Sequence, residues 1–195
     1  MTLTNQKNTF YPGMISSDVE FFVVEDEMKF ISEGEIKSTR KLPFSIIQLT
    51  QEEIEKDAAA DAALNEWHPE SEFKRQNQFL KCRYGGLDFS ADIEDNKFKD
   101  GDYWDCPNRS TCKYNGIICK PPKYNGVSLN IIDIKLMKLL STTLTNETIA
   151  AMLKLPFGSF HKHKQSLYAK LGDSPNNPIQ TKQEVALIAK SFNLI

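Results

Sequence analysis

The 195-residue sequence lacks any long apolar run and lacks the residue patterns that mark common enzymes. No stretch approaches the roughly 18–20 uncharged apolar residues that a membrane-spanning helix needs. The opening MTLTNQKNTF has neither a basic start nor an apolar signal core. We therefore expect a cytoplasmic protein without membrane contact. No nucleophile–base set, phosphate-binding loop or pair of catalytic carboxylates can be placed, so we do not expect an enzyme, and no small-molecule ligand can be inferred.

Charge is distributed unevenly along the chain, although the net charge is only −2. Residues 1–127 carry 16 basic and 22 acidic side chains, whereas residues 128–195 carry 8 lysines and 4 acidic side chains. A small basic domain joined to an acidic one is typical of nucleic-acid-binding proteins, because neutralising phosphates supplies much of their affinity. A solvated lysine face is the other interpretation of this excess.

The segment KPPKYNG at residues 120–126 indicates a linker or a firm turn, because it holds two prolines and a glycine. We place a domain boundary there and expect an α+β domain over residues 1–122. Residues 19–24 and 28–31 have strand character, with the acids Glu25 to Glu27 between them as a hairpin turn. Thr50 and Glu53 fit a capping box, which predicts a helix over residues 51–67. Another short strand is expected within residues 79–90.

The acidic segment also has a competing interpretation, because Val23 to Glu27 resembles the start of a response-regulator receiver domain. A receiver needs a helix directly after those acids and a phosphate-accepting Asp at the end of a later buried strand. Residues 28–34 instead alternate like a strand and end in Gly34. We therefore interpret the acids as a solvated turn.

From Ser128 onward the apolar spacing becomes helical. Ile132, Leu136, Leu139 and Leu140 form one stripe and predict a first helix. Thr145 is a suitable N-cap for a short second helix, whose inward residues are expected to be Ile149, Ala150 and Leu153. Val185, Ile188 and Ala189 predict an inward face for a last helix over residues 183–192.

A third helix is expected near residues 158–171, after the Leu155-Pro156 break. Phe160, Leu167 and Leu171 fall on one face of it. The opposite face carries short polar and basic side chains: Ser159, His161, Lys162, Gln165 and Ser166. A helix with such donors, preceded by a short helix and a tight turn, can place its N-terminal half in the major groove of DNA.

These residues resemble the LuxR-type (GerE-type) helix-turn-helix over residues 128–195. Matches to the family pattern are Glu147, Ile149, Ala150, Leu153, His163, Lys170 and Leu171, while Pro156 and Phe160 depart from it. The resemblance implies an all-α, four-helix domain that binds double-stranded DNA. By that resemblance His161, Lys162 and Gln165 face bases, while Thr145, Asn146, Ser159, His163 and Lys170 lie near phosphates or support the turn. Ser166 shares the exposed face and completes the predicted DNA-binding set.

All four cysteines, Cys82, Cys106, Cys112 and Cys119, lie within one segment. Four thiolates are the number that a tetrahedral zinc or an iron–sulfur site needs, although no Cys-x-x-Cys pair is present. Three interpretations remain open: a structural zinc site over residues 82–119, reduced and unligated cysteines, or an iron–sulfur sensor. Disulfides are not expected in a cytoplasmic protein.

Two functions are compatible with these patterns. The first is a sequence-specific DNA-binding transcription regulator, expected as a homodimer because helix-turn-helix domains usually bind paired half-sites. The second is a metal-stabilised protein interaction module without DNA binding. Salt dependence separates them, since an affinity for duplex DNA that does not fall as salt rises would contradict phosphate contacts.

Overall fold

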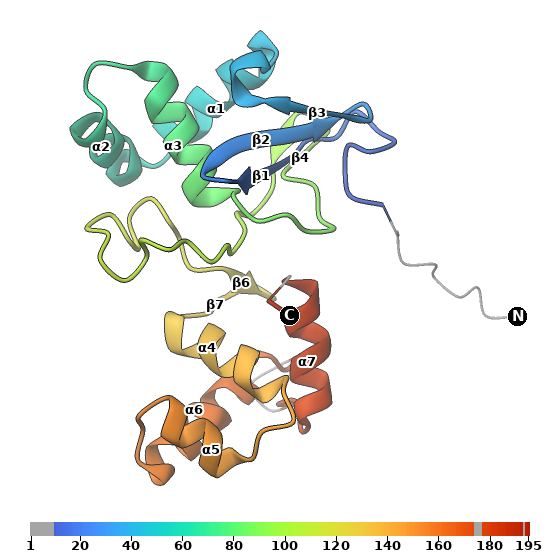
Figure 1. Cartoon of the computed structure of the whole chain (residues 1–195), viewed down its shortest axis with the longest axis vertical. Helices are drawn as coiled ribbons and strands as arrows, with labels where there is room; N and C mark the ends of the chain where they lie inside the picture. Colours follow the sequence, from blue (N-terminus) through green and yellow to red (C-terminus); the bar gives the residue numbers. More distant parts are fainter. Residues whose placement is uncertain (1–9, 174–176, 193) are drawn as a thin grey trace, which may run out of the picture. The chain divides into compact units, whose positions relative to one another are not determined.

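The structure, a computed structural model, describes residues 10–173, 177–192 and 194–195 (Figure 1). Small antiparallel sheets occur together with helices, so the chain is a mixed α+β protein. It divides into two compact units, one that ends at Lys120 and one that runs from Pro121 to Ile195. None of the described helices is long and apolar enough to cross a membrane.

A three-stranded antiparallel sheet lies at the start of the first unit. Its strands pair in the order β1 (Glu20–Val24), β2 (Glu27–Ser32) and β3 (Glu35–Ser38). Val24 pairs with Glu27, so Glu25 and Asp26 form a two-residue turn with φ values of 50° and 67°. Positive φ at both turn residues is what a type I′ hairpin requires. The predicted strands and the acidic hairpin turn are confirmed.

Three α-helices follow the sheet, after a short 3-10 helix η1 (Thr39–Lys41): α1 (Phe44–Glu55), α2 (Ala58–Trp67) and α3 (Glu72–Arg83). The single helix predicted over residues 51–67 is therefore wrong. Thr50 does not cap a helix, because it is buried inside α1 and its hydroxyl donates to the Ile46 carbonyl oxygen at 2.7 Å. The cap that separates the two helices is Asp57, whose side chain accepts from the Ala60 amide at 3.2 Å.

The strand predicted within residues 79–90 is also wrong, because residues up to Arg83 complete α3. Gln76, Phe79 and Leu80 are buried at helical spacing. The buried face of α3 therefore begins before residue 79, where the predicted strand was expected to start. A two-stranded ladder follows later, formed by β4 (Ile93–Glu94) and β5 (Lys97–Phe98).

Aromatic side chains link the sheet, α3 and the β4–β5 ladder in the core of the first unit. The ring centroid of Tyr84 lies 6.5 Å from that of Phe21 and 4.8 Å from that of Phe98. Phe79 packs against Tyr84 edge-on at 6.1 Å. Ile118, fully buried, belongs to the same core and anchors the later part of the unit to it.

Residues 99–122, between β5 and the next strand, contain neither helix nor strand. Their backbone forms turns, in which the Cys112 amide donates to the Asn108 carbonyl oxygen and the Ile118 amide donates to the Tyr114 carbonyl oxygen. The Arg83 side chain donates to the Ile118 carbonyl oxygen at 2.5 Å and so attaches this segment to the end of α3.

The second unit begins with a small hairpin of β6 (Lys123–Tyr124) and β7 (Val127–Ser128). Asn125 and Gly126 form its turn with φ values of 47° and 78°, which again fits type I′. The firm turn expected near residues 120–126 is therefore present. The domain expected to be all-α from residue 128 onward begins instead with the last residue of this strand pair, Ser128.

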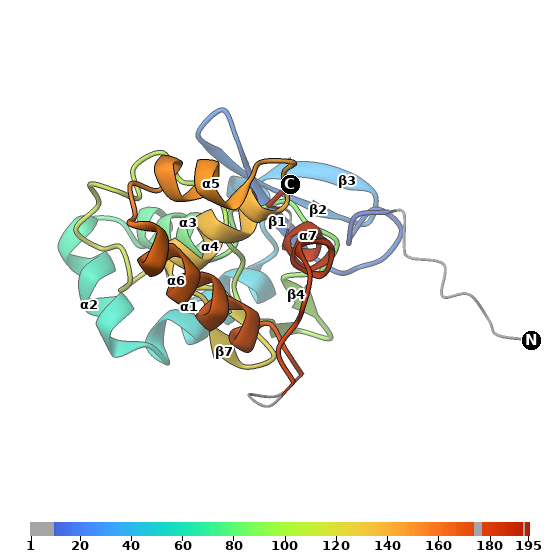
Figure 2. The same cartoon turned by 90° about the horizontal axis from the view of Figure 1, so that it is seen from below.

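Four helices complete the second unit: α4 (Ile131–Leu140), α5 (Asn146–Met152), α6 (Phe157–Lys170) and α7 (Lys182–Ser191). They lie where the sequence predicts helices, and α4 contacts each of the other three (Figures 1 and 2). The predicted inward stripe of α4 is shifted, because Ile132 is 38% exposed while Ile134 and Met137 are buried.

Candidate nucleic-acid interface

The short helix α5 begins at a polar cap. The Thr145 side chain accepts from the Thr148 amide at 3.3 Å, as the sequence predicts for an N-cap. Ile149 and Ala150 are buried, whereas Leu153, also predicted to face inward, is half-buried. The cap and the two buried side chains fix where α5 starts and which face it turns toward the core.

The turn between α5 and α6 is a Schellman motif. The Leu155 amide donates to the Ala150 carbonyl oxygen and the Lys154 amide to the Ala151 carbonyl oxygen, both at 3.0 Å. Lys154 takes the left-handed conformation with φ of 55°. The chain therefore reverses within a few residues, and α6 begins at Phe157 directly after Pro156.

The helix α6 has the two faces that the sequence predicts. Phe160 and Leu167 are fully buried, and Leu171, which caps the helix, is 1% exposed. On the opposite face the exposed residues are His161, Lys162, Gln165 and Ser166, while Ser159 is half-buried. The side chains predicted to face bases therefore lie on one solvent-exposed face of a single helix.

The remaining residues of the predicted DNA-binding set lie at the edges of this face or beyond it. Thr145 is exposed at the start of α5, and Asn146 beside it is half-buried with an unpartnered Oδ1. His163 is half-buried on α6. Lys170 is also half-buried, and its Nζ lies 2.6 Å from the Asp133 carboxylate of α4.

The pair of Lys170 and Asp133 joins the end of α6 to the start of α4. Only 6% of the Asp133 side chain is exposed, and the same carboxylate accepts from the Asn130 amide at 2.8 Å in the capping box of α4. Lys170 therefore supports the helical packing directly, whatever else it contacts.

Charge on α6 has one sign. The helix contains three lysines and two histidines and no Asp or Glu. Its three neighbours each carry an acid in the first turn, namely Asp133, Glu147 and Glu184, and α6 has none. A helix N-terminus is itself partially positive, so basic side chains near it do not stabilise the helix. His161 and Lys162 lie near that end of α6 and therefore do not stabilise it through the helix dipole. Their placement suits an anionic partner.

Neighbouring side chains orient parts of this surface. Phe157 packs against the His161 ring edge-on with centroids 4.4 Å apart. Lys164 lies over the Tyr168 ring at 5.2 Å, and burial together with the nearby Lys182 lowers the pKa of Lys164. The Lys182 ammonium donates to the Leu144 carbonyl oxygen at 2.6 Å and so attaches α7 to the loop before α5.

Two of the four cysteines of the first unit are brought together. The Cys82 thiol donates to Cys119 and lowers the pKa of Cys119 to about 7, against the opposing effect of burial and with help from Arg109 and Arg83. The same contact, together with burial, raises the pKa of Cys82. Cys106 and Cys112 are half-buried, and no three thiols in the described part of the chain lie within 4.8 Å of one another.

A cluster of carboxylates in the first unit was not predicted from the sequence. Glu20, Asp92 and Asp102 lie 72 and 10 residues apart along the chain and meet in space. The available signal was Glu20, a lone acid inside the apolar segment VEFFVV. The positions of Asp92 and Asp102 depend on tertiary packing that the sequence does not reveal.

Comparison with protein-family models, with curated proteins and with solved structures finds no match to this chain.

Proposed function

We propose that this protein is a sequence-specific DNA-binding transcription regulator whose helix α6 enters the major groove. The observation that carries the proposal is the exposed face of His161, Lys162, Gln165 and Ser166 on a helix without acidic side chains. Side chains of this kind donate to base edges, and a lysine-rich unit neutralises phosphates. The proposed fold class of this unit is a LuxR-like helix-turn-helix.

The short helix α5 and the Schellman turn support this assignment. A helix-turn-helix needs a short supporting helix that packs behind the reading helix and a tight turn between them. Here α5 contacts both α4 and α6, and its Ile149 and Ala150 are buried. The outer face of α6 stays exposed to solvent. We propose a homodimer bound to two half-sites of duplex DNA as the working state.

Selection of bound fragments from the source genome, followed by affinity measurement at several salt concentrations, tests the proposal. We expect specific binding whose affinity falls at least about tenfold between 50 and 200 mM salt, because several phosphates are contacted. Selection of no fragment, or an affinity independent of salt, would contradict it. That second result would favour a protein interaction module instead.

We further propose that Cys82, Cys106, Cys112 and Cys119 hold a structural zinc ion. Support comes from the contact of Cys82 with Cys119 and from residues 99–122, which form a loop without helix or strand. Because no three thiols in the described part of the chain lie within 4.8 Å of one another, zinc binding would have to draw Cys106 and Cys112 toward that pair. Loops longer than about 12–15 residues inside compact domains are uncommon unless something fixes them. Thiolate ligands suit zinc, and the ion would connect α3 to this loop.

Elemental analysis of the purified full chain tests the metal. One equivalent of zinc is expected, lost in Cys119→Ser. One equivalent of iron would instead identify an iron–sulfur cluster, and less than about half an equivalent of either metal would exclude a four-thiolate site.

A further inference from the structure

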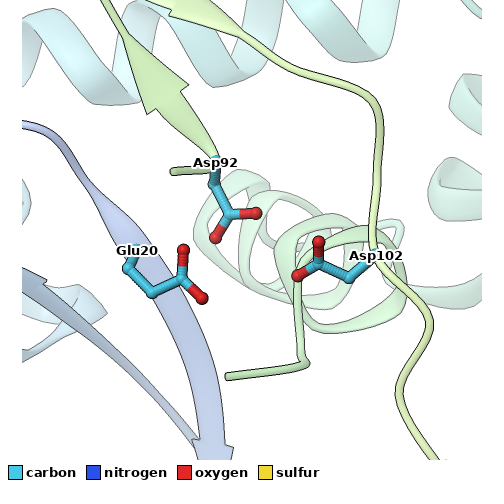
Figure 3. A group of neighbouring side chains, drawn as sticks. All are labelled: Glu20, Asp92 and Asp102. Carbon is cyan, nitrogen blue, oxygen red and sulfur yellow. The ribbon is translucent and has the colours of Figure 1, made fainter. Parts of the chain in front are cut away.

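Three carboxylates converge in the interior of the first unit (Figure 3). Glu20 comes from β1, Asp92 lies just before β4, and Asp102 belongs to the loop of residues 99–122. One oxygen from each lies within 4.8 Å of the others. Figure 3 shows the carboxylate groups directed toward one another.

The carboxylates of Glu20 and Asp92 each use one oxygen to accept a backbone hydrogen bond and leave the other oxygen without a partner. The Asp88 amide donates to Glu20 Oε1 at 2.8 Å, and the Phe21 amide donates to Asp92 Oδ2 at 2.6 Å. Glu20 Oε2, Asp92 Oδ1 and Asp102 Oδ2 are buried and accept no hydrogen bond. Glu20 is 0% and Asp92 1% exposed, so solvent does not satisfy these atoms.

No basic side chain in the described part of the chain forms an ion pair with any of the three acids. Buried acids of like charge are strongly unfavourable when nothing neutralises them. Burial, and then the charges of Asp88 and Asp102, raise the pKa of Glu20 to about 9 against its backbone hydrogen bonds. Burial and the nearby Asp88 raise the pKa of Asp102 to about 8, although the Asp92 side chain opposes this. The cluster therefore retains protons near neutral pH unless a cation replaces them.

The position of Asp102 is fixed by close backbone packing. Its amide donates to the Arg83 carbonyl oxygen at 2.7 Å. A Cβ at Gly101 would lie 2.8 Å from the Arg83 carbonyl oxygen, and a Cβ at Gly86 would lie 3.0 Å from the Tyr103 carbonyl oxygen. Glycine at both positions lets the loop lie directly against the end of α3, which holds Asp102 opposite the other two acids.

We propose that Glu20, Asp92 and Asp102 together bind one divalent cation of the hard, oxygen-preferring class that includes Mg²⁺, Mn²⁺ and Ca²⁺. The unpartnered oxygens Glu20 Oε2, Asp92 Oδ1 and Asp102 Oδ2 supply three ligands of the type these ions prefer. Asp102 is only half-buried, so water completes the coordination from its side. The ion links β1, the start of β4 and the loop of residues 99–122, and its binding does not depend on DNA.

Calorimetric titration and thermal unfolding of the full chain test the site. The protein is dialysed against cation-free buffer, which leaves a thiolate-bound metal in place, and is titrated separately with Mg²⁺, Mn²⁺ and Ca²⁺ at pH 7.5. We expect one equivalent of at least one ion to bind. At a concentration about 100-fold above its dissociation constant, that ion should raise the unfolding temperature by about 5–10 °C.

Variants separate cation binding from proton sharing among the acids. Asp92→Asn keeps an oxygen that can accept from the Phe21 amide but removes a charge, and it should weaken cation binding at least tenfold. Without cation this variant should be as stable as the original chain or more stable. Asp95→Asn is the matched control, because Asp95 is exposed in the β4–β5 turn with φ of 52°, which Asn also tolerates, and it should leave cation binding unchanged.

The proposal is overturned if none of the three ions binds at millimolar concentration, which would mean that the acids share protons. It is also overturned if Asp92→Asn binds the ion as well as the original chain does. Should Asp92→Asn fail to fold, Asp102→Asn on the half-buried loop decides in the same way. None of these results bears on DNA binding, which is measured separately.

Discussion

Asp57 connects three segments of the first unit through one carboxylate. It caps α2, its Oδ2 accepts from Arg83 of α3 at 2.6 Å, and Lys120 lies 3.0 Å from the same oxygen. Burial opposes ionisation of Asp57, but the hydrogen bonds from Lys120 and Arg83 outweigh it and lower its pKa from 3.8 to about 2. The ionised form is therefore the one that stabilises the fold.

Asp57→Asn tests this contribution, because Asn keeps the helix cap and removes the charge. A depressed pKa in the folded state gives stability that is present above pH 4 and lost as the pH falls toward 2. At pH 7 we expect the variant to be less stable by about 1–2 kcal/mol after allowance for solvent screening. Urea unfolding of both proteins at several pH values measures the difference, and a difference that persists unchanged at pH 2 would contradict the assignment.

Lys170 illustrates how a residue assigned to DNA from sequence can also have a structural role. Its ammonium lies 2.6 Å from the Asp133 carboxylate, of which 6% is exposed. Removing one partner of a buried ion pair leaves an uncompensated charge. We expect Lys170→Met to destabilise the chain by about 1–3 kcal/mol, and the double variant with Asp133→Asn to recover part of that loss.

Thermal unfolding of these two variants measures the coupling between the residues. Equal stability of Lys170→Met and the original chain would show that the pair contributes nothing to the fold. In that case any loss of DNA affinity in Lys170→Met would come from a phosphate contact alone.

At the scale of elements, the turn between α5 and α6 is built on a residue that is unfavourable there. Lys154 has φ of 55° in the position where a Schellman motif usually has glycine. The left-handed conformation costs a residue with Cβ roughly 1–2 kcal/mol, of which the greater chain entropy of glycine cancels a part.

Lys154→Gly should therefore stabilise the second unit by about 0.5–1 kcal/mol. Chemical denaturation checks this, with Lys154→Ala as the control that removes the side chain but keeps the Cβ. If the alanine variant were stabilised as much as the glycine variant, the backbone conformation would not be the cause.

The helices of the second unit could be predicted because their signals are local. Thr145 caps α5, and Phe160, Leu167 and Leu171 repeat at helical spacing. In the first unit a local signal misled, since Thr50 and Glu53 match a capping box but lie inside α1. The helix begins earlier, at Phe44 directly after Pro43, and its buried face is formed by Ile46, Thr50 and Ile54.

At the scale of the whole molecule, the uneven charge distribution could be predicted, but the acidic cluster could not. A basic C-terminal region follows from counting side chains, whereas Glu20, Asp92 and Asp102 meet only after the sheet, α3 and the later loop have packed together. For the cysteines, part of the arrangement could be predicted from the sequence and part depends on tertiary packing. Their clustering along the chain indicated a common site, and packing brings Cys82 and Cys119 into contact.

The affinity of the double variant Lys162→Ala with Gln165→Ala for a selected DNA fragment tests the central claim most directly. Both side chains are exposed on α6, so the unfolding temperature should stay unchanged. Specific affinity should fall by roughly 10²–10⁴-fold, to the level of unrelated DNA, because two contacts to base edges are lost. Lys135→Ala, which removes an exposed lysine from α4, is the matched control and should retain specific binding. Unchanged specific binding by the double variant, or an equal loss in the control, would contradict the assignment of α6 as the DNA-reading helix.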